Sequence, residues 1–247
     1  MYTISPDEIK HFTRDSAGHL SWADCYASVS GCRPGPPGGG YAATVNAAGT
    51  WLYTAAASAP GTGAVARYKI GPGGALTFAG CNGRLLTATC APTGPPGAVD
   101  GAISVAVTSD GTQLYVAAQL GNVISHFTVD KGGNLTFAGC TGDHPGCAPT
   151  SPSWALDGAD SATLSWTGAD LYAVSTSGQA VSHLKVDAAG NPVFISCIAD
   201  HPGCAATAPA GTLAIADGVA VSGDGTSLYA TSAGASSVSH FTIAPLF

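Results

Sequence analysis

Charged residues are scarce in this chain: Asp, Glu, Lys and Arg make up 9% of its 247 residues, and the eight Lys and Arg residues are scattered singly. Proteins that bind nucleic acid present clustered cations to the phosphates. The dispersed basic residues and the net charge of -7 therefore argue against a nucleic-acid partner. No apolar run approaches the ~20 residues that a membrane-spanning helix needs, so we expect no membrane span.

Strong amphipathic helix patterns are also absent. Apolar residues still make up 45% of the chain, largely Ala and Val, and 34 glycines and 16 prolines supply turn residues. A disordered chain would carry more charge and fewer aromatic residues. This composition predicts an all-β protein with many tight turns, long enough to bury a sizeable core.

Several motifs of enzymes are missing. The chain has no GxSxG nucleophile elbow, no dinucleotide fingerprint and no phosphate-binding loop. The stretch 35–40 is rich in Gly and Pro but contains no lysine, which indicates a linker between repeats. We therefore expect no bound cofactor, and a divalent cation remains the one alternative.

The segment 100–147 shows how the chain is built. Short apolar strands are expected at 103–108, 114–118, 123–129 and 135–139, separated by Asp110-Gly111, Gly121-Asn122 and a Gly-rich turn at 131–134. Asp, Asn and Gly tolerate the positive φ angles that such tight turns demand. Cys140 and Cys147 then bracket a short loop. Other parts of the chain repeat this unit.

Aligning the repeats on the tyrosine of the second strand places one tyrosine in each of five units: Tyr2, Tyr53, Tyr115, Tyr172 and Tyr229. Blade-sized spacing of this kind predicts a β-propeller of four-stranded antiparallel blades. We expect one domain over 1–247, with repeats at about 1–40, 41–97, 98–153, 154–211 and 212–247.

The first and last repeats are incomplete. The chain opens on a second strand and ends just after a third strand, so strands of the same kind occur at both ends. Two arrangements follow: a five-bladed ring with two thinned blades, or an open arc completed by other material. Open β edges pair readily with other chains, so we expect a homo-oligomer or assembly through these edges.

The eight cysteines form four local pairs. In each of the first four repeats, one pair follows the fourth strand. This even, repeated pattern predicts disulfides between Cys25 and Cys32, Cys81 and Cys90, Cys140 and Cys147, and Cys197 and Cys204. Disulfides imply an oxidising compartment, so we expect a secreted or cell-surface protein. The N-terminus has no basic-then-apolar order typical of a signal peptide, and we expect a processed form or part of a longer chain.

The paired strand motifs VAVTSDGTQLYVAA (105–118) and VAVSGDGTSLYATS (219–232), followed by VISHFTVD or SVSHFTIA, resemble the lactonase-like, 6-phosphogluconolactonase-type β-propeller family. Within it, the chain is most similar to secreted bacterial propellers with a cysteine-pair loop in each blade. The resemblance covers essentially the whole chain and implies a propeller fold. The family usually has seven blades, whereas this chain has five repeats, and the enzymes of the broad family are intracellular and lack the cysteine clips.

Four aspartates are the best candidates for binding a cation or a polar ligand. They stand where the chain enters the first, innermost strand of a blade, and such loops converge on the axial funnel of a propeller. They are Asp100, Asp157, Asp160 and Asp217. The alternative is ordinary turn chemistry, in which the carboxylate accepts backbone N–H bonds. We expect that turn role for Asp110 and Asp224.

Histidines and tryptophans offer weaker candidates. A histidine recurs in the third strand of four repeats (His11, His126, His183, His240), where a packing role is favoured over a metal or anion site. The twin loops with Asp143-His144 and Asp200-His201 contain zinc ligand types, but disulfide loops explain them better. The four tryptophans fit packing better than sugar stacking: Trp22, Trp51, Trp154 and Trp166.

Since the repeats are uniform and catalytic groups normally differ from one another, no catalytic residue is assigned. The favoured function is an extracellular, non-catalytic propeller scaffold for self-assembly or ligand binding. One alternative is a lactonase-like hydrolase that uses the four aspartates, with or without a metal ion, in the axial funnel. A second alternative is a lectin-like propeller that binds a glycan or another small molecule between blades.

Overall fold

A computed structural model describes residues 1–5, 8–27, 31–34, 40–57, 61–84 and 90–243. The strands form five separate sheets, each of which lies within one repeat. The predicted all-β propeller architecture is confirmed. The linker expected at 35–40 falls outside the described residues except for Gly40. Within the described ranges, no helix is both long and apolar enough to cross a membrane.

The third blade shows the complete pattern. Its strands β9 (Ala102–Val107), β10 (Gln113–Ala118), β11 (Val123–Val129) and β12 (Leu135–Gly142) follow one another as an antiparallel meander. The Asp110 carboxylate accepts hydrogen bonds from the Thr112 backbone N–H at 3.0 Å and the Thr108 hydroxyl at 2.6 Å, which closes the first turn. This is the turn role expected for Asp110.

The second and fourth blades repeat this meander. The second blade contains β5 (Ala42–Val45), β6 (Trp51–Ala56), β7 (Gly63–Ile70), a short 3₁₀ turn η1 (Pro72–Gly74) and β8 (Leu76–Arg84). The fourth blade contains η2 (Ser153–Leu156), β13 (Ala159–Leu164), β14 (Asp170–Ser175), β15 (Ala180–Val186) and β16 (Pro192–Ile198).

The terminal blades are different. The first consists of β1 (Tyr2–Ser5), β2 (Glu8–Arg14), β3 (Leu20–Ala27) and the two-residue β4 (Arg33–Pro34). Strand β4 runs parallel to β3 and corresponds to the parallel bridges that follow the other cysteine loops. It is therefore not a fourth strand of the meander, and β1, which contains the repeated tyrosine, is the innermost strand of this blade. The fifth blade has three strands, β17 (Ala216–Val221), β18 (Ser227–Ser232) and β19 (Ser237–Thr242).

Apolar cores lie between successive blades. Alternating side chains of the second and third strands face the preceding and the following blade. Leu114 and Phe127 therefore pack with Tyr53 of the second blade, whereas Tyr115 and Ile124 pack with residues of the fourth. Four such cores join the five blades.

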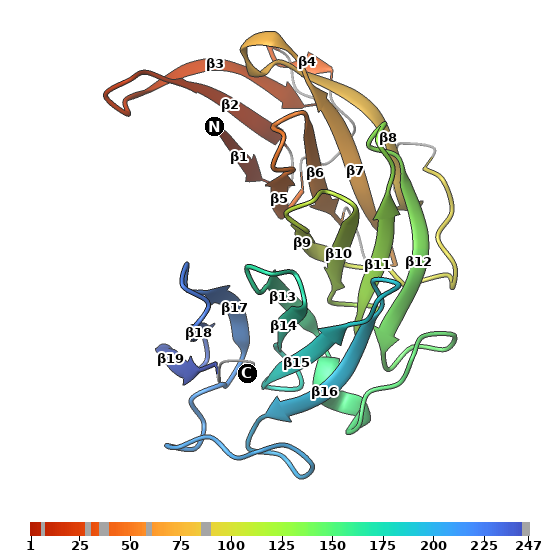
Figure 1. The fold of residues 1–247 in the computed structure, drawn as a ribbon, viewed down its shortest axis with the longest axis vertical. Coiled ribbons are helices and arrows are strands. Elements are labelled where there is room, and N and C mark those ends of the chain that lie inside the picture. Colours follow the sequence, from red (N-terminus) through yellow and green to blue (C-terminus); the bar gives the residue numbers. More distant parts are fainter. Residues whose placement is uncertain (6–7, 28–30, 35–39, 58–60, 85–89, 244–247) are drawn as a thin grey trace.

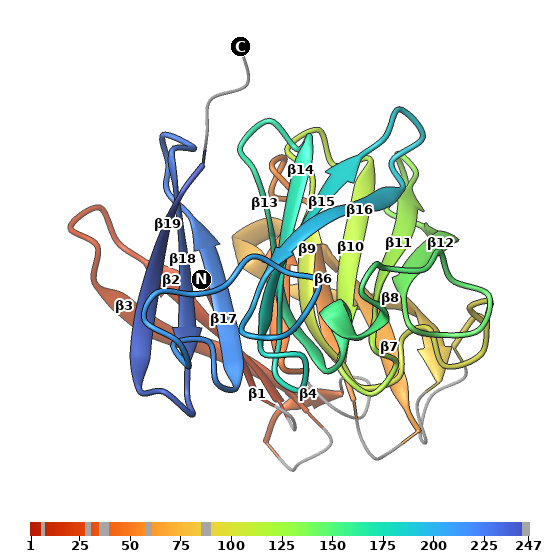
Figure 2. The same cartoon turned by 90° about the horizontal axis from the view of Figure 1, so that it is seen from below.

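The blades follow one another along an arc, with the first blade at one end and the fifth at the other (Figure 1). In the part of the chain that the structure describes, the inner strands of consecutive blades pack together, whereas the first and fifth blades make no comparable contact. Of the two expected arrangements, the structure therefore has the open arc. In Figure 2 inner strands such as β9, β13 and β17 run roughly along the same direction, whereas the outer strands β3 and β16 are strongly inclined to them.

All four expected disulfides are present, between Cys25 and Cys32, Cys81 and Cys90, Cys140 and Cys147, and Cys197 and Cys204. Each closes a loop that leaves the fourth strand on the side where the next inner strand begins. The loops before the inner strands, the turns between second and third strands and the cysteine loops thus share one end of the blades. We call this end the cysteine-loop face.

Candidate functional site on the cysteine-loop face

The four candidate aspartates occupy two different positions. Asp100 and Asp157 lie just before the inner strands β9 and β13, each followed by a glycine with positive φ. The fifth blade has Ile215, with φ 52°, at the position of those glycines. Asp217 therefore aligns with Asp160 and not with Asp100 and Asp157, although a glycine follows it as it follows those two.

Asp160 and Asp217 each occupy a β-bulge at the start of an inner strand. The register of β13 on β14 shifts between Ala159 and Ser161, and that of β17 on β18 shifts between Ala216 and Gly218. A bulge leaves one residue unpaired in the ladder and re-aims its side chain. In the third blade the bulge position is held by the apolar Ile103. Of these three blades, only the fourth and the fifth therefore have a carboxylate at the bulge.

The two bulge carboxylates influence each other electrostatically. Burial and the nearby Asp217 raise the pKa of Asp160 to about 6, and a hydrogen bond from Gln119 partly offsets this. The Gln119 amide lies after β10 of the neighbouring blade and donates to Asp160 Oδ1 at 2.8 Å. Three consecutive blades thus contribute to one polar cluster, and the pKa of Asp160 is raised toward the range that suits a general acid or base.

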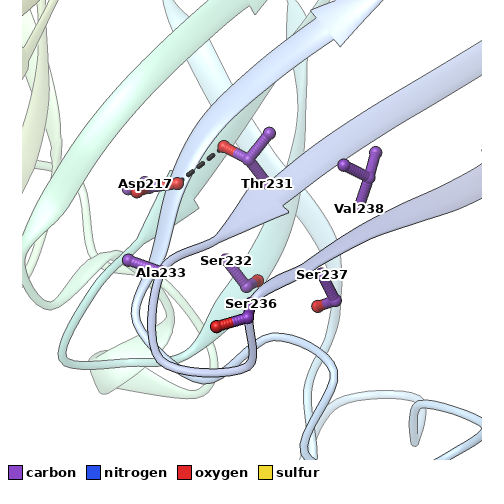
Figure 3. Close-up of a pocket in the computed structure, with 7 residues that line it drawn as sticks. All are labelled: Asp217, Thr231, Ser232, Ala233, Ser236, Ser237 and Val238. Carbon is purple, nitrogen blue, oxygen red and sulfur yellow. Dashed lines mark hydrogen bonds between the residues drawn. The ribbon is translucent and has the colours of Figure 1, made fainter.

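Asp217 faces the open side of the fifth blade. The Thr231 hydroxyl donates a hydrogen bond to Asp217 Oδ1 at 2.6 Å, and Figure 3 shows the two side chains pointing toward each other at the rim of a shallow pocket of about 300 Å³. The hydroxyl side chains of Ser232, Ser236 and Ser237 also line this pocket. The pocket offers hydrogen-bonding groups to a polar ligand.

Asp157 is the one of the four aspartates with a buried, unpaired oxygen among the described residues. This oxygen is Oδ1, which accepts no hydrogen bond within those residues. Burial, together with the Asp143 carboxylate of the preceding cysteine loop, raises the pKa of Asp157.

Asp100 lies at the equivalent place one blade earlier and lines a larger cavity of about 530 Å³ together with Arg84 and His144. Neither Asp100 nor Asp157 shows the expected turn chemistry, because no backbone N–H bond to either carboxylate is present in the described part of the chain. By contrast, Asp224 accepts the Thr226 N–H at 3.1 Å, as expected for a turn residue.

The recurring histidines have the packing role expected of them. Each stacks on the tyrosine directly across the strand pair, with ring centroids 5.0–5.2 Å apart, in the pairs Tyr2–His11, Tyr115–His126, Tyr172–His183 and Tyr229–His240. The second blade has Arg67 opposite Tyr53 instead.

The cysteine loops hold their histidines apart from each other. His144 Nδ1 donates to the Pro145 carbonyl at 3.1 Å, whereas His201 packs edge-on against Trp154. Within the described ranges, no group of three or more His, Cys, Asp or Glu residues is arranged to hold a metal ion. Trp51 is partly buried, while Trp22 and Trp166 are 55% and 71% exposed.

We call the polar cluster formed by Asp160, Asp217, Gln119 and Thr231 the axial cluster. Two of its members, Gln119 and Thr231, were not predicted from the sequence. The position of Gln119 is occupied by Thr176 in the fourth blade and by Ala233 in the fifth. The only sequence feature that could have indicated its role is this difference between repeats. Thr231 continues an ordinary strand pattern, and its hydrogen bond to Asp217 depends on the bulge. Bulges leave little trace in a sequence.

No protein-family model and no curated protein matches the chain. Among solved structures, candidate 6-phosphogluconolactonases from Bacteroides uniformis and Bacteroides fragilis match 98% of this chain, with TM-scores of 0.67 and 0.64 at 14% and 18% identity. The periplasmic gluconolactonase of Pseudomonas aeruginosa matches 99% of it with a TM-score of 0.57 at 16% identity. The chain spans 62%, 63% and 67% of these three proteins respectively. At such identities the likeness shows the fold alone, and the expected β-propeller fold is confirmed.

Proposed function

We propose that the axial cluster around Asp160 hydrolyses a sugar-type lactone. The observation that carries this proposal is the half-buried Asp160 carboxyl, whose pKa is raised to about 6 beside Asp217. A carboxylate with this pKa is ionised at neutral pH and is a stronger base than an exposed aspartate, so it suits general-base catalysis.

The reaction needs one proton acceptor and one proton donor. Ionised Asp160 accepts a proton from water while the water oxygen bonds to the lactone carbonyl carbon. The ring C–O bond then breaks, and the leaving alkoxide takes the proton back to give a hydroxy acid. The Gln119 amide fixes Asp160 through Oδ1, which leaves Oδ2 for the water. Asp217, Thr231 and the serines of the adjoining pocket provide hydrogen-bond partners for the sugar hydroxyls.

The fold supports a lactone substrate, because two of the similar structures are candidate 6-phosphogluconolactonases and a third is a periplasmic gluconolactonase. The four disulfides are consistent with a similar extracellular or periplasmic location. This proposal replaces the sequence-based preference for a non-catalytic scaffold as the leading function.

The test is the rate of D-glucono-δ-lactone opening above the spontaneous rate, followed by pH-stat. Asp160→Asn keeps an acceptor for Gln119 but cannot take a proton, so we expect a rate loss of about 10²–10⁴-fold. Asp187→Asn in the same blade is the matched control, since Asp187 accepts backbone N–H bonds at a hairpin on the opposite face, and it should retain full activity. Equal rates for wild type and Asp160→Asn across a lactone panel would refute the proposal. A rate that depends on added divalent cation would assign the aspartates as metal ligands instead.

Exposed end faces favour assembly as a second function. Tyr172 and Val181 of the fourth blade are covered by the fifth blade, and their side chains are only 8% and 4% exposed. The equivalent residues of the fifth blade, Tyr229 and Val238, are 42% and 67% exposed. At the other end, Leu20 is 46% exposed, whereas its equivalent Leu76 is 5% exposed. The two ends thus present the complementary faces that meet between blades elsewhere, and a second copy of this chain is the partner that fits both. The native mass of the chain in solution tests this function.

A further inference from the structure

The largest departure from repeat symmetry outside the axial cluster lies between the second and third blades. A cavity of about 530 Å³ is lined there by Arg84 at the end of β8, by Asp100 before β9 and by His144 of the next cysteine loop. Its volume falls within the range of small-molecule sites, about 300–1,000 Å³. This cavity plays no part in the hydrolysis proposed above.

At this cavity a glycine stands where the next blade has a tryptophan. The Gly97 carbonyl accepts the Asp100 N–H at 2.9 Å, and the Trp154 carbonyl accepts the Asp157 N–H at the same distance, so the two residues are equivalent. In the fourth blade the Trp154 ring packs against His201, with centroids 5.2 Å apart. In the third blade Gly97 has no side chain, and the His144 ring packs directly over it, because a Cβ there would lie 2.8 Å from His144 Nε2.

Charge also differs between the two places. Arg84 and Asp143 both follow a positive-φ glycine that comes two residues after the first cysteine of their loop. The third and fourth blades therefore bring the carboxylates of Asp143 and Asp157 near each other, whereas Arg84 and Asp100 line one cavity between the second and third blades. The latter two side chains both line the cavity, and within the described ranges they form no ion pair with each other.

Two acceptor atoms of the cavity lie beside Gly97. A methyl group built on Gly97 would lie 2.8 Å from His144 Nε2 and 3.6 Å from Asp100 Oδ2, so both atoms are held close to this glycine on the cavity wall. Because His144 Nδ1 donates to the Pro145 carbonyl at 3.1 Å, Nε2 is the acceptor of the neutral ring. Pro92, Val99 and the Cys90 half-cystine supply an apolar wall.

We propose that this cavity binds a small polyhydroxy acid. Arg84 pairs with its carboxylate, for which the planar guanidinium is suited. Asp100 and His144 Nε2 accept hydrogen bonds from its hydroxyl groups, and the apolar wall packs against its C–H faces. A single site follows, not one between every pair of blades, because only this junction combines the glycine, the cation and both acceptors within the described residues.

Titration calorimetry with D-gluconate as the probe tests the site. We expect saturable one-to-one binding that weakens about 10-fold or more in Arg84→Gln, since a charge-assisted hydrogen bond contributes about 1.5–3 kcal/mol. Asp100→Asn should also weaken binding. The matched control is Arg14→Gln, which removes the same charge from an exposed hairpin of the first blade and should leave the affinity unchanged. Arg84 is exposed, so its substitution leaves the fold intact.

Two further ligands separate the contributions. Acetate has the carboxylate without hydroxyls and glucose has hydroxyls without the charge, and each should bind more weakly than gluconate. In ¹⁵N-histidine NMR spectra, gluconate should shift the His144 imidazole signals and leave those of the exposed His19 in place. Equal affinity of wild type and Arg84→Gln, or no binding of gluconate at millimolar concentration, would overturn the proposal, whatever the outcome of the lactone assay.

Discussion

Asp160 makes the stability of the molecule depend on pH. Its pKa is about 6 in the folded chain and about 3.9 in an unfolded chain. Between these values the folded state binds the extra proton, so the free energy of unfolding falls as the pH rises from 4 to 6. Asp160→Asn removes this cost. After allowance for solvent screening of the half-buried group, we expect the variant to gain about 1–2 kcal/mol relative to wild type between pH 4 and pH 7, measured by urea unfolding.

Asp187→Asn supplies a control of opposite sign. Backbone hydrogen bonds from Asn191 and Ala189 and the Asn191 side chain lower the pKa of the exposed Asp187. Its contribution to stability is therefore present above the unfolded pKa and is lost as the pH falls, so this variant should be less stable than wild type at pH 7 and equal to it at low pH. A constant difference between Asp160→Asn and wild type over the whole range would show that Asp160 titrates like an exposed aspartate.

Between elements, the hairpin that joins the third strand to the fourth locks the fourth blade, and likewise the second, to the blade before it. Gly190 of the fourth blade has φ 87°, and its carbonyl accepts the Tyr115 hydroxyl at 2.8 Å. A Cβ there would lie 2.7 Å from Gln113 Oε1 and 2.9 Å from His126 Cε1. The Tyr2 hydroxyl bonds the Gly74 carbonyl in the same way at 2.5 Å.

Gly190→Ala tests this lock by denaturant unfolding. The side chain would meet both the positive φ and the His126 ring, so we expect a loss of about 2–4 kcal/mol. Gly49→Ala is the control, because Gly49 has φ 66° but nothing lies within 4 Å of its added Cβ, and only the backbone cost of about 1–2 kcal/mol remains. Equal losses in the two variants would mean that the hairpin does not press on the preceding blade.

The same elements show what a sequence can and cannot predict. The strands around Tyr115 were predictable because apolar alternation and the turns at Asp110-Gly111 and Gly121-Asn122 agree with each other, and the cysteine pairs were predictable because they repeat. The cluster at Asp160 was predictable only as a set of acidic residues. Its pairing with Asp217 depends on bulges and on Ile215 with positive φ in place of a glycine, and neither feature has a residue signature.

For the whole molecule, the exposed end faces predict the state of the chain in solution. The Tyr229–His240 stack of the fifth blade is the counterpart of Tyr115–His126, on which the Gly190 hairpin rests. At the other end, Gly18 occupies the position of Gly190 in the hairpin of the first blade, with φ 92° and only the Arg14 side chain near it. The first blade of one copy therefore matches the fifth blade of another, and contacts of this head-to-tail kind build rings or filaments.

Light scattering after size exclusion should accordingly give a mass above the 24.2 kDa of one chain, rising with concentration. Val238→Asp places a charge on the fifth-blade face and Leu20→Asp places one on the first-blade face, and each should return the protein to a monomer because burying an unpaired charge is costly. Val193→Asp is the matched control, since Val193 is 46% exposed on β16 of the fourth blade, away from both ends. If wild type is monomeric at high concentration, or if the control dissociates the assembly as well as Val238→Asp does, the end faces are not the joints between copies.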